Sequence, residues 1–168
     1  MAEELTELVP DDIEAIAERV LRRACDADLK IVTAESCTGG LLASLLTDVE
    51  GASHAFERGF VSYSDSAKCE LLGIERETVE GCGAVSRQTA EAMVRGALRY
   101  SHGDVAVSIT GFAGPGAPGD EPGLVHFACG RRDGPIAHRE EHFGDIGRGP
   151  IRVAALRAAL EMLDDAFD

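Results

Sequence analysis

The sequence predicts an α/β protein, a three-layer α/β/α sandwich with a mixed, mostly parallel sheet. Short runs rich in β-branched residues alternate along the chain with stretches whose apolar residues recur at helical spacing. Two strand-like runs near the C-terminus flank the turn-like segment 131–134, which predicts an antiparallel pair. No internal repeat or linker divides the 168 residues, so we predict a single domain over residues 1–168.

Each predicted strand is a short apolar run bounded by turn residues. Alternation is clearest in Asp104-Val-Ala-Val-Ser-Ile-Thr110. Because helical stretches separate the first three runs, those strands are expected to be parallel to one another. The predicted strands are 29–34, 59–63, 104–110, 123–129 and 135–143.

The first and last predicted helices carry apolar residues at helical spacing on one face. The first opens with Pro10-Asp11-Asp12, a favoured first turn, and continues with Ile13, Ile16 and Val20. Ser86 is suited to cap the N-terminus of a later helix. The predicted helices are 10–25, 41–49, 64–72, 86–100 and 151–167.

The segment 111–123 holds three of the six prolines and five of the nineteen glycines of the chain. It follows a predicted strand directly and shows no helical or strand pattern. A loop of this length inside a compact domain is usually functional or disordered. We therefore take its first residues as candidates for a binding site.

The charge balance limits the partners of the protein. Thirty acidic residues face sixteen basic ones, and only Lys30 and Lys68 are lysines, so the net charge is −14. Such a field opposes nucleic acids and anionic membranes, so neither is predicted as a partner, and any phosphate site must be locally positive. An acidic surface with few lysines fits a cytosol of molar salt; the alternative is an ordinary acidic protein with arginine in place of lysine.

Several features predict a cytoplasmic protein. No apolar run reaches the roughly 20 residues that span a bilayer. The acidic segment 1–7 differs from the basic start of a signal peptide. The cysteines form no C-x-x-C motif, which argues against a disulfide framework and a zinc ribbon. They are Cys25, Cys37, Cys69, Cys82 and Cys129.

Ser36 is the candidate nucleophile. It lies in the segment 33–40, just past a predicted strand and before a predicted helix, where open α/β sheets bind ligands. Backbone N–H groups at a helix start are unpaired and can hold a developing oxyanion. The alternative is that Ser36 or Thr38 merely caps the helix, and spacing alone does not decide between the two.

A serine needs a base, and the histidines lie outside the glycine-rich turns and strand ends where one is expected. His138 and His142 have the i,i+4 spacing of a metal pair, but their segment is predicted as a strand, so no metal site is predicted. Tyr63 and Lys68 leave a strand end and enter a helix, and they are the better partners for Ser36. The alternative for Lys68 is a solvated position on the helix surface.

Four motifs occur in a characteristic order along the chain. They are Ala34-Glu-Ser-Cys-Thr-Gly-Gly40, Phe56-Glu-Arg-Gly-Phe-Val-Ser-Tyr-Ser-Asp-Ser-Ala-Lys68, Gly83-Ala-Val-Ser86 and Thr110-Gly-Phe-Ala-Gly-Pro115. In this the chain resembles the CinA C-terminal domain, the nicotinamide-nucleotide amidase family. The resemblance covers about residues 10–165, and it is to the stand-alone form, because longer members carry an additional N-terminal domain.

The resemblance implies hydrolysis of nicotinamide mononucleotide to nicotinic acid mononucleotide and ammonia, with no metal or cofactor. Ser36 would be the nucleophile and Tyr63 and Lys68 its activating partners, with the immediate base left open. A small-molecule nucleotide is then the partner, and a homodimer is expected at the level of the family. The implied substrate-binding residues are Glu35, Cys37, Thr38, Gly39, Thr110, Gly111, Ala113, Gly114, Arg148 and Arg152.

One departure from the family pattern concerns the arginines. Members usually show Gly-Asp-Arg followed shortly by another arginine, whereas this chain has Gly144-Asp-Ile-Gly-Arg-Gly-Pro-Ile-Arg152. A short insertion displaces the first arginine to Arg148, so either Arg148 or Arg152 could meet the substrate phosphate. Two other functions stay open: a non-catalytic nucleotide-binding module, and an amidase for another small carboxamide.

Overall fold

The computed structural model describes residues 9–168, so the acidic segment 1–7 considered above lies outside the described residues. Within this range five strands form one sheet, in the order β2-β1-β3-β4-β5. In chain order the strands are β1 (Ile31–Glu35), β2 (Phe56–Val61), β3 (Val105–Gly111), β4 (Leu124–Arg131) and β5 (Ile136–His142).

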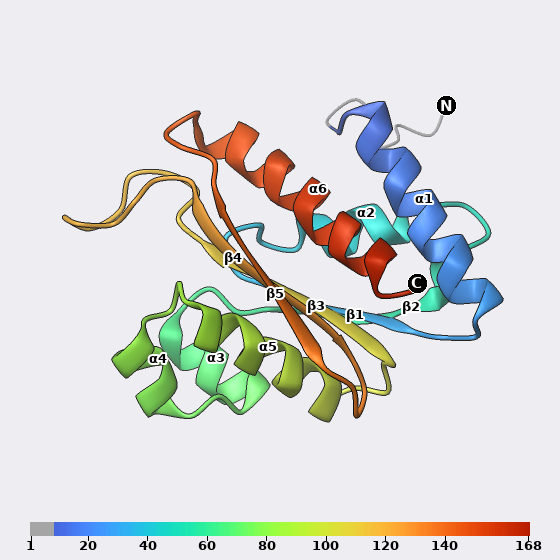
Figure 1. Ribbon diagram of the computed structural model, residues 1–168, viewed down its shortest axis with the longest axis horizontal. Coiled ribbons are helices and arrows are strands. Elements are labelled where there is room, and N and C mark those ends of the chain that lie inside the picture. The colour runs from blue at the N-terminus through green and yellow to red at the C-terminus, as the bar shows by residue number, and fades with distance from the viewer. Residues whose placement is uncertain (1–8) are drawn as a thin grey trace.

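Helices cover both faces of the sheet, which confirms the three-layer α/β/α fold (Figure 1). One layer holds α1 (Asp11–Asp26), α2 (Leu41–Thr47) and α6 (Arg148–Asp165). The other holds α3 (Asp65–Leu72), α4 (Arg76–Cys82) and α5 (Arg87–Arg99). None of the helices within residues 9–168 is both long and apolar enough to cross a membrane.

The sheet is mixed, but it is less parallel than the sequence predicts. Strand β1 pairs in parallel with β2 and β3, whereas β3–β4 and β4–β5 are antiparallel. The cause is the connection between β3 and β4. The loop 112–123 leads directly from the end of β3 into the adjacent β4, so β4 runs in the opposite direction, whereas a crossover helix would have made it parallel. Two of the four strand pairs within the described range are therefore parallel and two are antiparallel.

Some boundaries differ from the predicted ones. Strand β2 begins at Phe56, three residues before the predicted start, and α6 begins at Arg148 with Pro150 in its first turn. Helix α4 and the short 3-10 helix Ser53–Ala55 were not predicted. In α4 only Val79 is buried, so the helix has no apolar face to detect.

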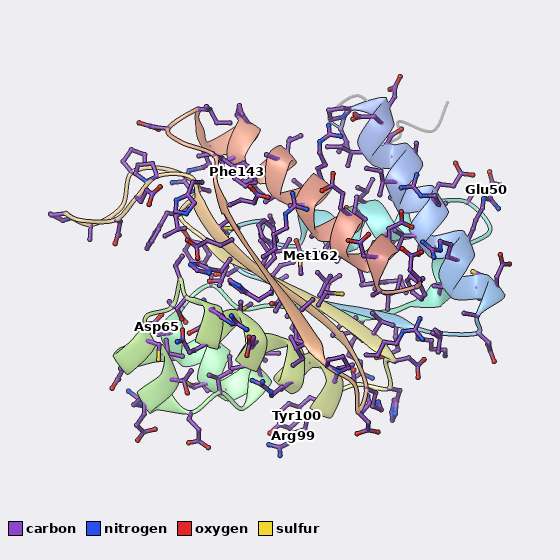
Figure 2. The ribbon with its side chains drawn as sticks, viewed as in Figure 1. Glu50, Asp65, Arg99, Tyr100, Phe143 and Met162 are labelled. Carbon is purple, nitrogen blue, oxygen red and sulfur yellow. The ribbon has the colours of Figure 1, made fainter. Side chains whose placement is uncertain are left out.

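The core consists of two apolar clusters, one on each face of the sheet. In β3 the bulky Val105, Val107 and Ile109 pack toward α1 and α6, whereas Ala106 packs toward α5. Met162 of α6 belongs to the first cluster and lies over the sheet (Figure 2). Small residues on the other face allow α5 to lie close to the strands.

A close contact fixes α3 beneath the sheet. A Cβ atom built on Gly96 of α5 would lie 2.1 Å from the carbonyl oxygen of Leu72, the last residue of α3. Any side chain at position 96 would therefore push α3 away from α5. Helix α3 also carries Lys68, so this contact helps to position the candidate site.

Candidate active site

Ser36 lies where β1 ends, at the carboxyl edge of the parallel strands. Its N–H donates to the carbonyl of Ile109 in β3, with an N···O distance of 3.0 Å, and its side chain is buried. The chain then turns through Gly39 and Gly40, whose φ angles of 60° and 96° favour glycine. The serine is therefore held between a strand and a tight turn, as the sequence predicts.

Lys68 extends toward Ser36 from α3, which lies in the helical layer on the other side of the sheet from α2 (Figure 1). The Lys68 Nζ lies 3.0 Å from Ser36 Oγ in a buried hydrogen bond. The Lys68 side chain is itself buried, being only 1% exposed. This burial excludes the alternative of a solvated lysine on the helix surface.

Three oxygen atoms surround the Lys68 amine. Besides Ser36 Oγ, they are the carbonyl oxygens of Ser62, at 3.0 Å, and Tyr63, at 3.3 Å. Burial lowers the pKa of Lys68, although the nearby Asp65 carboxylate opposes the shift. The neutral amine, which can accept a proton, is therefore favoured more than in an exposed lysine.

The Tyr63 phenol is not part of this arrangement. The Tyr63 side chain is 72% exposed, and among the described residues its hydroxyl group forms no hydrogen bond; only its carbonyl contacts Lys68. The sequence analysis missed Ser62, whose carbonyl anchors the amine and whose N–H donates to the carbonyl of Glu35. Its position within the second motif was the only signal.

Glu35 caps α2. Its Oε1 accepts hydrogen bonds from Thr38 Oγ1 at 2.7 Å and from the N–H of Leu42 at 2.9 Å, and its Oε2 accepts one from the N–H of Ala43 at 3.0 Å. The residue before the helix is Gly40, which has no side chain for capping. Ser36 and Thr38 therefore do not cap α2, which removes the alternative role considered for Ser36.

The end of β3 is hydrogen-bonded to the segment that precedes α5. Thr110 Oγ1 donates to the carbonyl of Ala84 at 2.7 Å, which joins the third and fourth motifs. Ala113 and Gly114 are buried, whereas the rest of the loop projects from the sheet (Figure 1). Gly111 ends β3, two residues after Ile109, whose carbonyl accepts the hydrogen bond from the Ser36 N–H.

Both arginines approach the site from the start of α6. Arg152 Nη2 donates to the carbonyl of Thr38 at 2.9 Å, while its buried Nε has no partner. Arg148 is exposed, and a Cβ atom built on Gly114 would lie 3.2 Å from its Nη2. Among residues 9–168 the Arg148 guanidinium makes no hydrogen bond or ion pair. The two guanidinium groups thus lie near different segments, Arg152 at Thr38 and Arg148 at Gly114.

Cys37 follows the serine but is poorly suited to act as a nucleophile. Its side chain is buried, and burial raises the pKa of its thiol to about 11. A thiol with this pKa carries almost no thiolate near neutral pH. Ser36 is therefore the stronger nucleophile candidate of the two adjacent residues.

Comparison with known proteins identifies the family of the chain. A family model described as the CinA C-terminal domain matches residues 13–167. The chain belongs to the CinA C-terminal domain family.

Two solved structures show the same fold. One is a competence/damage inducible protein, CihA, from Agrobacterium tumefaciens, with a TM-score of 0.92 and 47% identity over 96% of this chain and 99% of that one. The other, a CinA superfamily protein from Escherichia coli, has a TM-score of 0.85 and 34% identity over 92% of this chain and 91% of that one.

Relatives of this CinA C-terminal domain differ in length. A CinA-like protein from Chlorobium limicola is 47% identical over 147 residues, which are 85% of this chain but 32% of that protein. The chain thus spans about a third of that relative. A protein from Enterobacter agglomerans named nicotinamide-nucleotide amidohydrolase PncC is 43% identical over 139 residues, which are 82% of each chain.

Proposed function

We propose that this CinA C-terminal domain hydrolyses the carboxamide of nicotinamide mononucleotide, releasing ammonia and nicotinic acid mononucleotide. Ser36 is the nucleophile and Lys68 its base. The observation that carries the proposal is the buried contact of 3.0 Å between Lys68 Nζ and Ser36 Oγ. The name of the Enterobacter agglomerans relative supports the choice of substrate.

The acceptors around Lys68 suit a neutral amine. Such an amine has two N–H bonds and one lone pair, and the carbonyls of Ser62 and Tyr63 accept the two N–H bonds. The lone pair then faces the Ser36 hydroxyl group. Serine paired with lysine is a known variant of serine catalysis.

The reaction then proceeds in two stages. As Lys68 takes the hydroxyl proton, Ser36 Oγ forms a bond to the carboxamide carbon. The ammonium group of Lys68 returns that proton to the departing nitrogen as the C–N bond breaks, which gives ammonia and an acyl-serine. Water, deprotonated by the same amine, attacks the acyl carbon, and Ser36 leaves with its proton restored.

The oxyanion of each tetrahedral intermediate needs donors beside Ser36. Glu35 already occupies the N–H groups of Leu42 and Ala43, so they are not free for this task. The N–H groups of Cys37 and Thr38 donate to no backbone carbonyl within the described part of the chain. We assign the oxyanion to these two groups, where each donor stabilises the transition state by about 3–4 kcal/mol.

The charges also suit a pyridinium nucleotide. The cationic ring withdraws electrons from the carboxamide and further disfavours a proton on nearby Lys68. The phosphate needs local positive charge in a protein of net charge −14. Arg148 supplies an unengaged guanidinium beside Gly114, and we propose it as the phosphate ligand.

Ammonia release from nicotinamide mononucleotide tests the proposal directly, at low salt and in molar potassium chloride. Ser36→Ala should lower turnover by about 10³-fold or more. The exposed Ser53→Ala serves as the matched control and should keep full activity. Near-normal release by Ser36→Ala would remove the serine from the mechanism.

Two further outcomes separate the alternative functions. Thermal stabilisation by the nucleotide without any ammonia release from the unmodified protein would favour a non-catalytic binding module. Faster release from nicotinamide or another small carboxamide than from the mononucleotide would keep the chemistry but change the substrate. The proposal expects the mononucleotide to be the preferred compound.

A further inference from the structure

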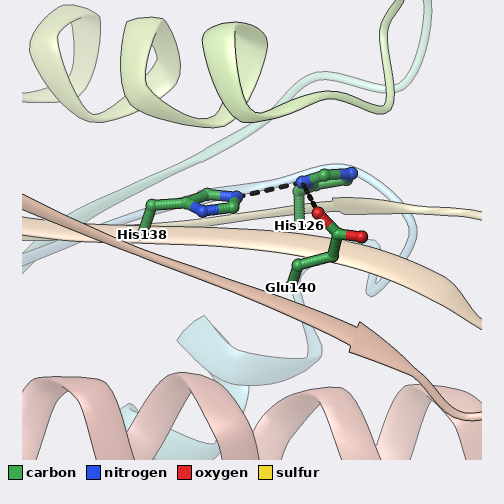
Figure 3. Close-up of side chains that lie close together, drawn as sticks. All are labelled: His126, His138 and Glu140. Carbon is green, nitrogen blue, oxygen red and sulfur yellow. Dashed lines mark hydrogen bonds and ion pairs between the residues drawn. The ribbon is translucent and has the colours of Figure 1, made fainter.

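Three side chains with metal-binding atoms meet on β4 and β5. His126 lies on β4 and faces Glu140 of β5 in the antiparallel register, and His138 lies opposite Ala128, two residues along the same face. Figure 3 shows the three side chains converging on one point above the two strands. The cluster lies on the α5 side of the sheet, which also holds Ala128.

The distances suit a single ion. His126 Nδ1 lies 3.0 Å from His138 Nε2 and 3.9 Å from a carboxylate oxygen of Glu140. One ligand atom from each residue lies within 4.8 Å of the other two. In tetrahedral zinc sites, bonds of about 2.0–2.1 Å place ligand atoms about 3.3 Å apart. Small side-chain rotations would therefore give three metal bonds without moving the strands.

The chemistry of the three groups points in the same direction. His126 is buried and His138 partly so, and each imidazole carries a ring nitrogen whose lone pair can bind a metal ion. The Glu140 carboxylate is hydrogen-bonded to His142 through Oε1, while its Oε2 lies toward His126. Two imidazoles and one carboxylate form a ligand set found in zinc and iron sites, whereas Mg²⁺ and Ca²⁺ prefer oxygen ligands.

The charges packed around the cluster are mixed. Arg87 and Glu91 face it from α5, and these two side chains bind each other with an N···O distance of 2.8 Å. On the other side, His142 bridges Glu140 and Glu121. The guanidinium is thus paired with a carboxylate, so the surroundings do not repel a divalent cation strongly.

We propose that His126, His138 and Glu140 bind one divalent transition-metal ion of the zinc class. The Glu140 side chain is 45% exposed, so water can reach the ion as a fourth ligand. The ion would join β4 to the edge strand β5. The site is distinct from the Ser36 and Lys68 centre, because the intervening β3 separates them, and it does not depend on the proposed amidase activity.

The sequence analysis expected no metal because it weighed only the i,i+4 pair of His138 and His142. In a strand, residues i and i+2 share a face, and a neighbouring strand supplies the third ligand. His138 and Glu140 have this spacing, and the register of β4 adds His126. Register depends on contacts between distant segments, so sequence spacing alone could not reveal the set.

Zinc chloride titration of the chelator-treated full chain tests the site, in molar potassium chloride with excess Mg²⁺ to suppress weak binding to the acidic surface. Calorimetry should give one ion per chain, and saturation should raise the melting temperature. Long-range imidazole NMR spectra should show coordination through Nδ1 of His126 and Nε2 of His138. This readout needs no variant, so it holds even if a substitution disturbs folding.

Variants then assign the ligands. His138→Gln and Glu140→Gln should each weaken zinc binding by at least about 100-fold. His102→Gln, which removes an exposed histidine elsewhere, should bind like the unmodified protein, whereas His142→Gln, which removes a hydrogen bond to Glu140, should weaken binding less than the two ligand variants do. The site would be overturned by an unmodified chain that binds no zinc, by ligand variants that bind zinc as tightly as the unmodified chain, or by a loss of binding only in His142→Gln. Ammonia release, measured on the same samples, should be unchanged by His138→Gln, so failure of the metal site stays distinguishable from failure of the amidase.

Discussion

Lys68 of α3 lies 3.0 Å from Ser36 at the end of β1, although 32 positions separate them in the chain. The contact joins a helix of one layer to the carboxyl edge of the sheet, and both side chains are buried. An amine in such a place costs free energy when it is charged. The pair is therefore arranged for proton transfer, and its behaviour with pH follows from its burial.

The pH dependence of turnover is the first prediction. Because burial lowers the pKa of Lys68 and only the neutral amine accepts a proton, kcat/KM should rise with pH through that lowered pKa and then level off. Lys68→Arg keeps a permanent charge and should lose about 10³-fold or more at every pH. Lys30→Arg changes the other lysine, which is exposed, and is the control. A flat profile, or an active Lys68→Arg variant, would contradict the assignment of Lys68 as the base.

Glu35→Gln tests whether this residue caps the helix or binds substrate. In the variant, the amide NH₂ group would face a backbone N–H that now donates a hydrogen bond to Glu35. Two donors cannot bond each other, so we expect the free energy of unfolding to fall by about 1–3 kcal/mol. Denaturant unfolding measures this, with the exposed Glu50→Gln as the control. Unchanged stability together with a large rise in KM would instead assign Glu35 to the substrate.

The two arginines should separate by substrate. Arg148→Ala should raise KM for nicotinamide mononucleotide much more than for nicotinamide riboside, because only the mononucleotide carries a phosphate. Arg152→Ala should lower kcat with both compounds, because Arg152 holds the carbonyl of Thr38 beside the nucleophile. Steady-state kinetics with the two substrates checks both expectations. A phosphate-specific effect in Arg152→Ala alone would reverse the assignment.

The ion pairs between α1 and α6 should make stability depend on pH. Burial alone would raise the pKa of Asp164, but hydrogen bonds from Arg19 and Arg23 outweigh it, so the pKa is lowered. A lowered folded-state pKa stabilises the protein above the unfolded value of about 3.9, and this stabilisation is lost as pH falls through the folded value. Asp164→Asn should therefore cost about 1 kcal/mol at pH 7 and much less near pH 3.

Thermal or denaturant unfolding at the two pH values checks this expectation. Asp165→Asn changes an exposed neighbour and should have little effect at either pH. An equal loss of stability at pH 7 and pH 3 for Asp164→Asn would show that packing, and not charge, is responsible. High salt should also reduce the effect of Asp164→Asn, because the Arg19 side chain is 53% exposed.

The elements that local signals define were predictable from the sequence. Ser86 caps α5 and Gly73 ends α3, as their residue types indicate. Helix α4 lacks such a signal because it buries little beyond Val79. The antiparallel direction of β4 relative to β3 was also missed, because the residues of the preceding loop do not show where in the sheet the next strand pairs.

The site was predictable in composition but not in detail. The motifs brought attention to Ser36 and Lys68, yet nothing local shows that the lysine is buried or that Tyr63 is exposed. Glu35 was expected to meet substrate, whereas in the structure its carboxylate binds the start of α2. Such facts depend on packing between segments far apart in the chain, and the catalytic and binding roles themselves stay predictions.

The Lys68 amine is oriented by the peptide oxygens of residues 62 and 63, not by their side chains. Every residue type carries such an oxygen, so the orientation of the Lys68 amine does not depend on which amino acids occupy those positions. Selection, or a protein engineer, could therefore vary the side chains at the mouth of the site to suit other molecules while the proton acceptor stays correctly placed.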